Sequence, residues 1–265
     1  MSRSGFYKWR SRLKKPSKKA QTLAANIVLF KEYHEEYPSH GYRWLNHKIR
    51  LDTGQLMSDP YAHKCCQIAG IRCKAKRYRY KKPGNPYRLY PNLLLADLDI
   101  NGPYQCVVSD MTAFYFNRQY YELTLYMDIW NNEILAHRLT AKRGDRMQYL
   151  DGLEDIKEIR RQHPEGEMIL HSDQGSVYAS KDFNEDLERY RISRSMSRAG
   201  TPTDNPVMEA VNGWIKAELF TDLHVTGERP IKEEVEEYIH FFNEERPAYA
   251  LGYLTPKQYK EMACR

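Results

Sequence analysis

The stretch that decides the fold of this chain is Leu170-His171-Ser172-Asp173-Gln174-Gly175-Ser176-Val177-Tyr178. An apolar run, Met168-Ile169-Leu170, leads into it, and a polar turn around Gly175 follows. This pattern predicts a buried strand that ends beside Asp173. In α/β folds the groups that bind ligands gather beyond the carboxyl ends of strands, so Asp173 is a candidate member of a metal site.

The composition is that of an ordinary soluble protein. The chain has 265 residues and is 41% hydrophobic, which suffices for one large or two modest domains. No run approaches the roughly 20 apolar residues that a membrane span needs, and the basic N-terminus lacks the apolar stretch of a secretory signal. The five cysteines are odd in number and none has Cys-x-x-Cys spacing. We therefore expect a cytoplasmic protein without membrane contact, disulfide framework or zinc ribbon.

Charge is divided sharply along the chain. Residues 1–90 hold 21 Lys and Arg against 5 Asp and Glu, a net charge of +16, whereas residues 91–265 hold 20 against 30, a net charge of −10. A basic part joined to an acidic part favours binding of a polyanion, because clustered cations supply phosphate contacts and release counterions. A basic tail that only improves solubility is the alternative. Aromatic residues interleaved with the charges favour nucleic acid.

Periodicity predicts a small helical domain near the N-terminus. A basic arm (1–19) precedes helices expected over 20–37, 42–51 and 59–70, the last capped by Ser58 or Asp59 with Pro60 in its first turn. Three short helices over 20–71 fit a helix-turn-helix unit, and a helical bundle without a DNA role is the alternative. A basic linker (72–97) follows. Its candidate DNA-binding residues are Arg72, Lys74, Lys76, Arg77 and Arg79.

From residue 98 to residue 265 the pattern predicts a mixed sheet covered by helices. Short apolar runs predict a strand over 105–109, a hairpin of 113–116 and 120–128 around Asn117-Arg118-Gln119, and a further strand over 134–139. Helices and strands then alternate. We expect helices over 146–162, 181–190, 204–221 and 231–245, and strands over 168–172 and 192–196.

Two further carboxylates are candidates to join Asp173. Asp110 follows the strand predicted over 105–109, and it approaches Asp173 if the first and fourth strands are neighbours. Glu209 lies 36 residues after Asp173, on the helix that follows a glycine-containing loop. Such a set could hold two Mg²⁺ or Mn²⁺ ions, which prefer oxygen ligands. The alternative is three ordinary solvated carboxylates.

Four blocks in the same order resemble the IS-three family of bacterial insertion-sequence transposases, whose catalytic core is similar to retroviral integrase. The resemblance covers about residues 20–259. The blocks are Ser109-Asp110-Met111-Thr112, His171-Ser172-Asp173-Gln174-Gly175-Ser176-x-Tyr178, Asp204-Asn205-Pro206-x-Met208-Glu209-Ala210 with Lys216-Ala217-Glu218-Leu219, and Tyr238-Ile239-x-Phe241-Phe242-Asn243-x-x-Arg246-Pro247. Upstream, Tyr37, Gly41-Tyr42-Arg43 and Gly54 resemble the accessory helix-turn-helix segment of that family.

The resemblance implies an α/β fold, namely a ribonuclease-H-like mixed sheet with flanking helices, preceded by a small all-α helix-turn-helix domain. It implies a DDE triad of Asp110, Asp173 and Glu209 that binds two Mg²⁺ ions, for which Mn²⁺ can substitute. It implies Mg-dependent cleavage of the ends of an insertion sequence by water, followed by attack of the freed 3′-hydroxyl on target DNA. It therefore implies double-stranded DNA as partner, a homo-oligomer on that DNA, and work at the nucleoid.

The roles of several other residues are open at this point. Lys216 stands seven residues after Glu209, where it could hold a phosphate or be an exposed helix lysine. Asn205 could contact DNA, position the loop or cap the helix, and Arg43 is a candidate DNA contact. His171 and Ser172 are expected to shape the turn, with a general base as the minor role for His171. Arg246 is expected to anchor a turn with Pro247.

The chain departs from the family pattern in places. Val107 replaces a usual tryptophan, and Pro206 replaces a usual alanine. The opening Ser2-Arg3-Ser4-Gly5-Phe6-Tyr7-x-Trp9 resembles a piece inside a longer protein, as expected of a second reading-frame product or a truncated copy. The upstream reading-frame protein is therefore an expected partner. Two other functions remain open: a DNA-binding regulator of transposition without catalysis, and a metal-dependent nuclease that does not join DNA.

Overall fold

The computed structural model describes residues 3–14, 16–74, 90–95, 98–198, 205–223, 225 and 227–264. The chain divides into two compact units: residues 1–75 with 221–223, and residues 76–220 with 224–265. Each unit is described by itself below. Within the described residues, none of the helices combines the length and the apolar character needed to cross a membrane.

The first unit is helical. It contains α1 (Arg3–Lys14), α2 (Lys18–Glu36), α3 (Tyr42–Thr53) and α4 (Asp59–Ala69). The core that joins the last three helices consists of fully buried side chains from each of them, among them Phe30, Leu45, Ile49, Ala62 and Cys65. The predicted helical N-terminal region is therefore present. Its action as a helix-turn-helix stays a prediction.

Local signals set the ends of these helices. Ser17 precedes α2 and its hydroxyl accepts a hydrogen bond from Ala20 N–H. Ser58 is the N-cap residue of α4, and a proline follows in the first turn. Both α3 and α4 end at a glycine in the left-handed conformation, Gly54 and Gly70. The lengths of the three helices thus follow from residues that the sequence displays.

The second unit is built on a five-stranded mixed sheet in the order β3-β2-β1-β4-β5. The first three strands pair antiparallel, while β1 pairs with β4 and β4 with β5 in parallel. This confirms the predicted α/β fold with flanking helices. The strands are β1 (Cys106–Phe116), β2 (Gln119–Asp128), β3 (Ile134–Thr140), β4 (Met168–Ser172) and β5 (Ile192–Met196).

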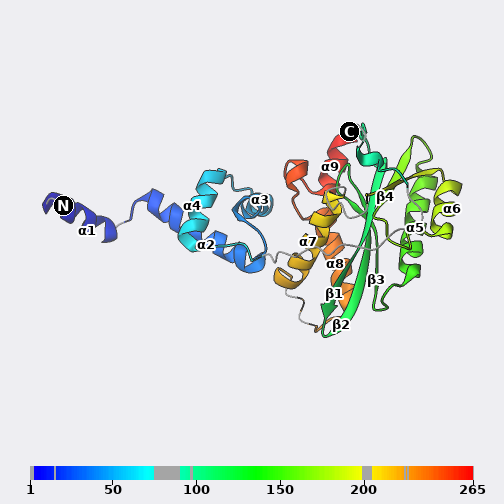
Figure 1. Cartoon of the computed structure of the whole chain (residues 1–265). Helices are drawn as coiled ribbons and strands as arrows, with labels where there is room; N and C mark the ends of the chain where they lie inside the picture. The colour runs from blue at the N-terminus through cyan, green and yellow to red at the C-terminus, as the bar shows by residue number, and fades with distance from the viewer. Residues whose placement is uncertain are drawn as a thin grey trace. The chain divides into compact units, whose positions relative to one another are not determined.

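Helices cover both faces of the sheet (Figure 1). On one face lie α5 (Arg146–Gln162) and α6 (Lys181–Arg189), and on the other lie α7 (Pro206–Thr221) and α8 (Ile231–Glu244). The C-terminal helix is α9 (Pro256–Ala263). Of two short 3-10 turns, η1 (Leu93–Leu95) precedes β1 and η3 (Tyr249–Leu251) lies between α8 and α9.

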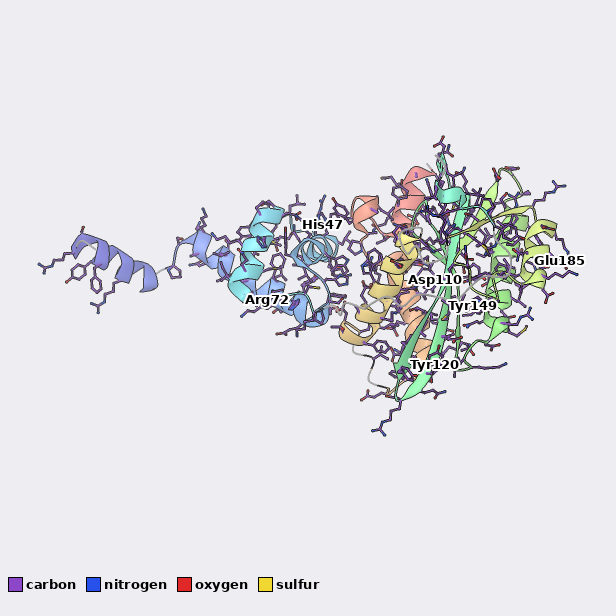
Figure 2. The ribbon with its side chains drawn as sticks, in the orientation of Figure 1. His47, Arg72, Asp110, Tyr120, Tyr149 and Glu185 are labelled. Atoms are coloured by element: carbon purple, nitrogen blue, oxygen red, sulfur yellow. The ribbon has the colours of Figure 1, made fainter. Side chains whose placement is uncertain are left out.

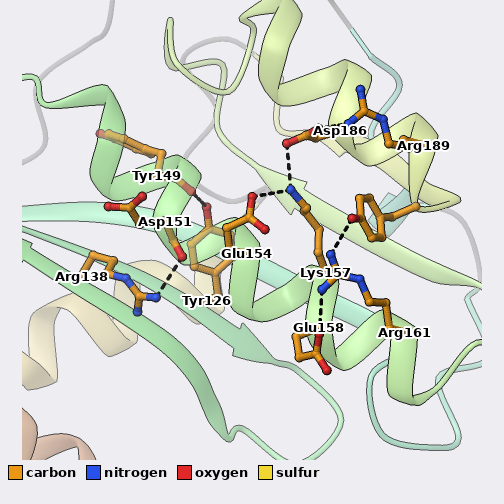
Figure 3. A network of polar contacts seen from close by, with 11 residues as sticks. Tyr126, Arg138, Tyr149, Asp151, Glu154, Lys157, Glu158, Arg161, Asp186 and Arg189 are labelled. Carbon is orange, nitrogen blue, oxygen red and sulfur yellow. Dashed lines mark hydrogen bonds and ion pairs between the residues drawn. The ribbon is translucent and has the colours of Figure 1, made fainter.

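Contacts between side chains fix α5 on its face of the sheet. The Tyr126 hydroxyl of β2 donates to the Tyr149 carbonyl at 2.7 Å, and Lys157 contacts Asp186 of α6 at 3.0 Å (Figure 3). Gly152 faces the Tyr126 ring so closely that a Cβ there would lie 2.5 Å from a ring carbon. Helix and sheet can approach this closely only because residue 152 is glycine.

The first strand differs from its prediction. We expected a strand over 105–109 and a separate one over 113–116, but β1 runs unbroken through the polar segment between them. The hairpin loop contains two residues rather than three: Asn117 and Arg118 have φ angles of 47° and 63°, and Phe116 pairs with Gln119. Asp110 therefore lies inside a strand and not at its end.

Candidate active site

The parallel pairing of β1 with β4 places Asp110 beside Asp173. The register pairs Val108 with His171 and Ser109 with Ser172, where β4 ends. The next residue on each strand is an aspartate. Adjacent strands lie about 4.8 Å apart, so the two carboxylates leave neighbouring backbones toward the same face. Beyond this point β1 continues without β4, which leaves that edge of the site open.

Glu209 reaches the same region from α7. It lies in the first turn of this helix, where its N–H donates to the carbonyl of Asn205 at 3.2 Å. One turn further on, Asn212 donates from Nδ2 to Oδ2 of Asp110 at 2.8 Å. Because residues three apart share a helix face, this bond also directs Glu209 toward β1. The Glu209 side chain is exposed to solvent.

The electrostatics of Asp110 connect the three carboxylates. Burial and then the negative charge of Asp173 raise the pKa of Asp110 to about 7, and the charge of Glu209 adds to this rise. Hydrogen bonds from Met111 N–H and Asn212 act in the opposite direction. The pKa of Asp110 (Figure 2) thus depends on the charges of both Asp173 and Glu209.

Asp173 is held by a turn that requires glycine. Its Oδ1 accepts a hydrogen bond from Gly175 N–H at 2.8 Å, and a Cβ at Gly175 would approach that same oxygen to 2.9 Å. The side chain is exposed by surface area, yet protein atoms surround its base, so burial raises the pKa of Asp173. The Gly175 bond and the positive charge of Arg194 partly offset that rise.

A buried polar network supports this turn from behind. Arg194 of β5 donates to the Leu170 carbonyl at 3.0 Å and to the Ser172 hydroxyl, and that hydroxyl donates to the Asp173 carbonyl at 2.8 Å. The His171 ring lies with Nδ1 at 2.8 Å from Ser195 Oγ and Nε2 at 2.9 Å from Ser197 Oγ. Both ring nitrogens of His171 are therefore engaged in holding the strand end.

Lys216 approaches the carboxylates from two turns further along α7. Burial lowers the pKa of its ammonium group, and the negative charge of Asp110 acts in the opposite direction. The side chain is half-buried. A lysine whose titration responds to Asp110 lies near the site and not on the outer face of the helix.

The other candidate DNA-binding residues lie on several different segments of the chain. Arg43 of α3 forms an exposed ion pair with Asp59 at 3.6 Å and stacks over the Tyr42 ring. Arg72 and Lys74 follow α4 and are exposed. Asn205 is buried directly before α7. Lys76, Arg77 and Arg79 lie outside the described residues, as does Asp204.

Two residues of the site were missed by the sequence analysis. Asn212 lies three residues after Glu209 and four before Lys216, so helical spacing from those residues could have revealed it. Arg194 interrupts an apolar alternation between Ile192 and Met196. A charged residue at a core position of a strand is the signal that could have indicated a buried partner.

The site supplies carboxylate oxygens that could bind a metal ion, but they are not arranged as a complete set of metal ligands. Among the residues that the structure describes, no group of three or more His, Cys, Asp or Glu side chains converges closely enough to hold a metal ion. The donors that face the site are nevertheless all carboxylates, the ligands that hard divalent cations prefer. A cation among them would offset the like charge that raises the pKa of Asp110.

A mixed sheet in the order β3-β2-β1-β4-β5, with acidic residues on β1, after β4 and on a following helix, defines the ribonuclease-H-like class of nucleic-acid enzymes. A family model described as "Integrase core domain" matches residues 100–202, and a second model with the same description matches residues 190–256. A chain of the simian T-cell lymphotropic virus intasome, solved with PP2A regulatory subunit B56 gamma, matches with a TM-score of 0.52 at 15% identity. That match covers 87% of this chain and 74% of the other.

The chain is similar to InsK, named as a transposase for insertion sequence element IS150 of Escherichia coli (strain K12). The two are 30% identical over 264 residues, which cover 97% of this chain and 89% of InsK. The transposase for insertion sequence element IS904 of Lactococcus lactis is 27% identical over 81% of this chain and 85% of its own length. The chain therefore belongs to the insertion-sequence transposases with an integrase core. It is a polynucleotidyl transferase that acts as a DDE transposase in transposition.

Proposed function

We propose that Asp110, Asp173 and Glu209 are the DDE triad of this transposase, that they bind two Mg²⁺ ions, and that the enzyme cleaves the ends of its element and joins them to target DNA. One observation carries the assignment: at an open edge of the sheet, the charges of Asp173 after β4 and Glu209 on α7 both act on Asp110 of β1. A pure DNA-binding protein has no need for converging carboxylates, since they repel phosphate.

The metal ions supply, when bound, activation of the attacking oxygen and stabilisation of the leaving oxygen. The residues of the chain orient the ligands. Asn212 fixes one oxygen of Asp110, and Gly175 fixes one oxygen of Asp173. Arg194 and Ser172 hold the backbone at Asp173, so its carboxylate leaves the strand in one direction.

Lys216 holds a phosphate of the DNA strand beside the triad in this proposal. Its half-buried ammonium group lies near Asp110, and a cation there attracts the backbone of the substrate. The exposed cations of the first unit, among them Arg43, Arg72 and Lys74, bind double-stranded DNA in this proposal. Asn205, buried before α7, acts by positioning the loop that leads to Glu209.

The proposal includes the partners and the place of action. Joining requires two DNA ends to be held together, which favours at least two copies of the chain on the DNA. The upstream reading-frame protein is a further proposed partner in recognition of the ends. Because the substrate is chromosomal DNA, we propose that the protein works at the nucleoid in the cytoplasm.

The test uses labelled DNA of the element's end, Mg²⁺, and the variant Asp173→Asn. We expect DNA binding close to that of the wild type but loss of both cleavage and joining by about a thousandfold or more, since metal catalysis supplies several kcal/mol. Asp182→Asn is the matched control, because Asp182 is an exposed aspartate of α6 paired with Arg146. Undiminished joining by Asp173→Asn would refute the assignment.

The same assay separates the two other functions. A regulator without catalysis would bind the end DNA but yield no cleaved product with the wild-type protein. A nuclease would yield cleaved product and no joined product at any Mg²⁺ concentration. Cleavage and joining that are lost together in Asp173→Asn distinguish the transposase from both.

A further inference from the structure

The tip of the β1–β2 hairpin carries an exposed group of aromatic and cationic side chains. Tyr115 of β1 is 65% exposed and packs edge-on against Tyr120 of β2, with ring centroids 5.5 Å apart. Arg143, in the loop between β3 and α5, places its guanidinium over the Tyr120 ring at 4.5 Å. Arg118 occupies the hairpin turn and is exposed. These four residues form the hairpin patch.

The hairpin patch is held in place from beneath. The buried carboxylate of Glu122 accepts a hydrogen bond from the Tyr120 hydroxyl at 2.7 Å and from Gly144 N–H at 2.9 Å. Gln148 of α5 donates to the same carboxylate at 3.1 Å. The ring of Tyr120 and the loop that carries Arg143 are thus fixed to one anchor. The surface is preorganised and does not depend on a mobile loop.

The charge of the hairpin patch stands out in this part of the chain. Residues 91–265 hold 20 Lys and Arg against 30 Asp and Glu. Most of these cations are paired with carboxylates, as Arg146 is with Asp182. Within the described part of the chain, Arg118 and Arg143 form no ion pair with an acidic side chain. An exposed tyrosine beside arginines that form no ion pair is the combination that single strands of nucleic acid use for stacking and phosphate contacts.

The hairpin patch is connected to the candidate active site. Gln148 of α5 donates to the Glu122 anchor, and the next residue, Tyr149 (Figure 2), packs edge-on against Tyr178, whose hydroxyl lies 2.8 Å from Ser109 Oγ beside Asp110. Along β1, Tyr115 is five residues beyond Asp110. At roughly 3.4 Å per residue the separation along the strand is about 17 Å, the axial length of about five nucleotides in one strand of a DNA duplex.

We propose that the hairpin patch binds the DNA strand about five nucleotides from the scissile phosphate, with Tyr115 stacking on an unpaired base and with Arg118 and Arg143 contacting phosphates. This rests on the proposed function, because that function locates the scissile phosphate at the triad. The strand passes the open edge of β1, where β4 has ended, to reach the α5 side of the sheet. The patch therefore adds a DNA contact to the otherwise acidic core.

The binding test uses a labelled duplex of the element's end with a single-stranded flank, titrated at several salt concentrations. We expect Tyr115→Ala to weaken binding about tenfold and Tyr115→Trp to retain it, because any aromatic face can stack. Replacing both arginines by glutamine should reduce the slope of log affinity against log salt by about 1.4, for two contacts to a single strand. Tyr249→Ala and Arg189→Gln are matched controls, since both residues are well exposed elsewhere.

An abasic scan of the flank gives the position of the contact. In the wild type, removing the base about five nucleotides from the cleavage site should weaken binding, and Tyr115→Ala should be insensitive to that removal. Binding by the patch variants equal to that of the controls would overturn the proposal. So would an abasic penalty that stays the same in Tyr115→Ala.

Failure of this proposal can be told from failure of the proposed function. At saturating DNA the patch variants should still cleave, whereas Asp173→Asn should bind normally and not cleave. If Asp173→Asn cleaves, the triad assignment fails while the binding data still report on the patch. If Tyr115→Ala and the double arginine variant bind like the wild type, the patch proposal fails while the triad stands.

Discussion

Glu218 of α7 and Asp110, which accepts a hydrogen bond from α7, differ in the charge of the groups around them. Glu218 is 1% exposed and accepts hydrogen bonds from Arg246 Nε at 3.0 Å, from a second Arg246 nitrogen at 2.9 Å and from the Tyr238 hydroxyl at 2.8 Å. Among the described residues, Asp110 accepts hydrogen bonds from two neutral donors, Met111 N–H and Asn212, and the negative charges of Asp173 and Glu209 act on it. A structural site is complete in the protein alone, whereas the charge around Asp110 calls for a cation from outside.

The Glu218–Arg246 ion pair, called the paired site below, also positions part of the site around Asp110, called the unpaired site. Arg246 follows α8, and its guanidinium stacks over Trp214 of α7 at 4.6 Å and over Phe242 of α8 at 5.1 Å. The ion pair with Glu218 therefore joins α7 to α8. Since α7 also carries Glu209, the buried pair positions one member of the proposed triad.

The largest expected effect comes from breaking the paired site. Arg246→Met leaves the Glu218 charge buried without its partner, so the free energy of unfolding should fall by about 4 kcal/mol in urea denaturation. Adding Glu218→Leu to that variant should restore most of the loss, because an apolar pair can replace a buried ion pair. Lys257→Met, which removes an exposed pair with Glu244, is the control and should change little. A mild loss in Arg246→Met would mean that the pair does not hold α7.

Arg246 illustrates which features of the structure can be predicted from the sequence and which cannot. We expected Arg246 to anchor a turn with Pro247, a local role. Its partner Glu218 lies 28 residues earlier, and only the packing of two helices brings them together. Helix and strand periods predicted α7 and α8 because those signals are local. The contact between them is long-range, and no local pattern encodes it.

The candidate site shows the same limit. The first and fourth strands are neighbours, which was the condition for Asp110 to approach Asp173, although Asp110 lies inside β1 and not at its end. The continuity of β1 was missed because Asp110-Met111-Thr112 lacks an apolar alternation, and pairing with β2 overrides that local signal. Asn212 and Arg194 were missed because their roles depend on partners in other elements. The roles assigned to the triad and to the DNA-binding residues remain predictions.

A second prediction concerns the unpaired site. In metal-free protein the folded-state pKa of Asp110 is about 7, against 3.8 for an ordinary aspartate, so the folded protein holds this proton more tightly than the unfolded chain does. Its stability is therefore greatest below pH 4 or so and is lost as the pH rises to about 7. The free energy of unfolding of Asp110→Asn should consequently exceed that of the wild type by up to about 4 kcal/mol at pH 8, and should not exceed it at pH 4.

Magnesium sharpens this second prediction. At pH 8, Mg²⁺ should raise the melting temperature of the wild type, because a cation at the site offsets the like charge. Asp110→Asn should show a smaller rise, and Asp182→Asn should behave as the wild type. Equal stability of the wild type and Asp110→Asn at pH 8 without metal would show that Asp110 carries no electrostatic strain.

The smallest expected effect concerns Asn212, the neutral side chain that donates to Asp110, whereas the charged Arg246 donates to Glu218. Within the described residues, Asn212 is the one side chain that hydrogen-bonds Asp110, and Asn212→Ala removes this bond while leaving every carboxylate in place. The Mg²⁺ concentration at half-maximal cleavage should rise about tenfold, as is usual when a partner that orients a metal ligand is lost. Asn243→Ala is the matched control, because its amide bonds the backbone of Ile134 at the edge of the sheet and should alter stability without moving the Mg²⁺ midpoint. If both variants shift that midpoint equally, Asn212 acts through general stability and not through the orientation of Asp110.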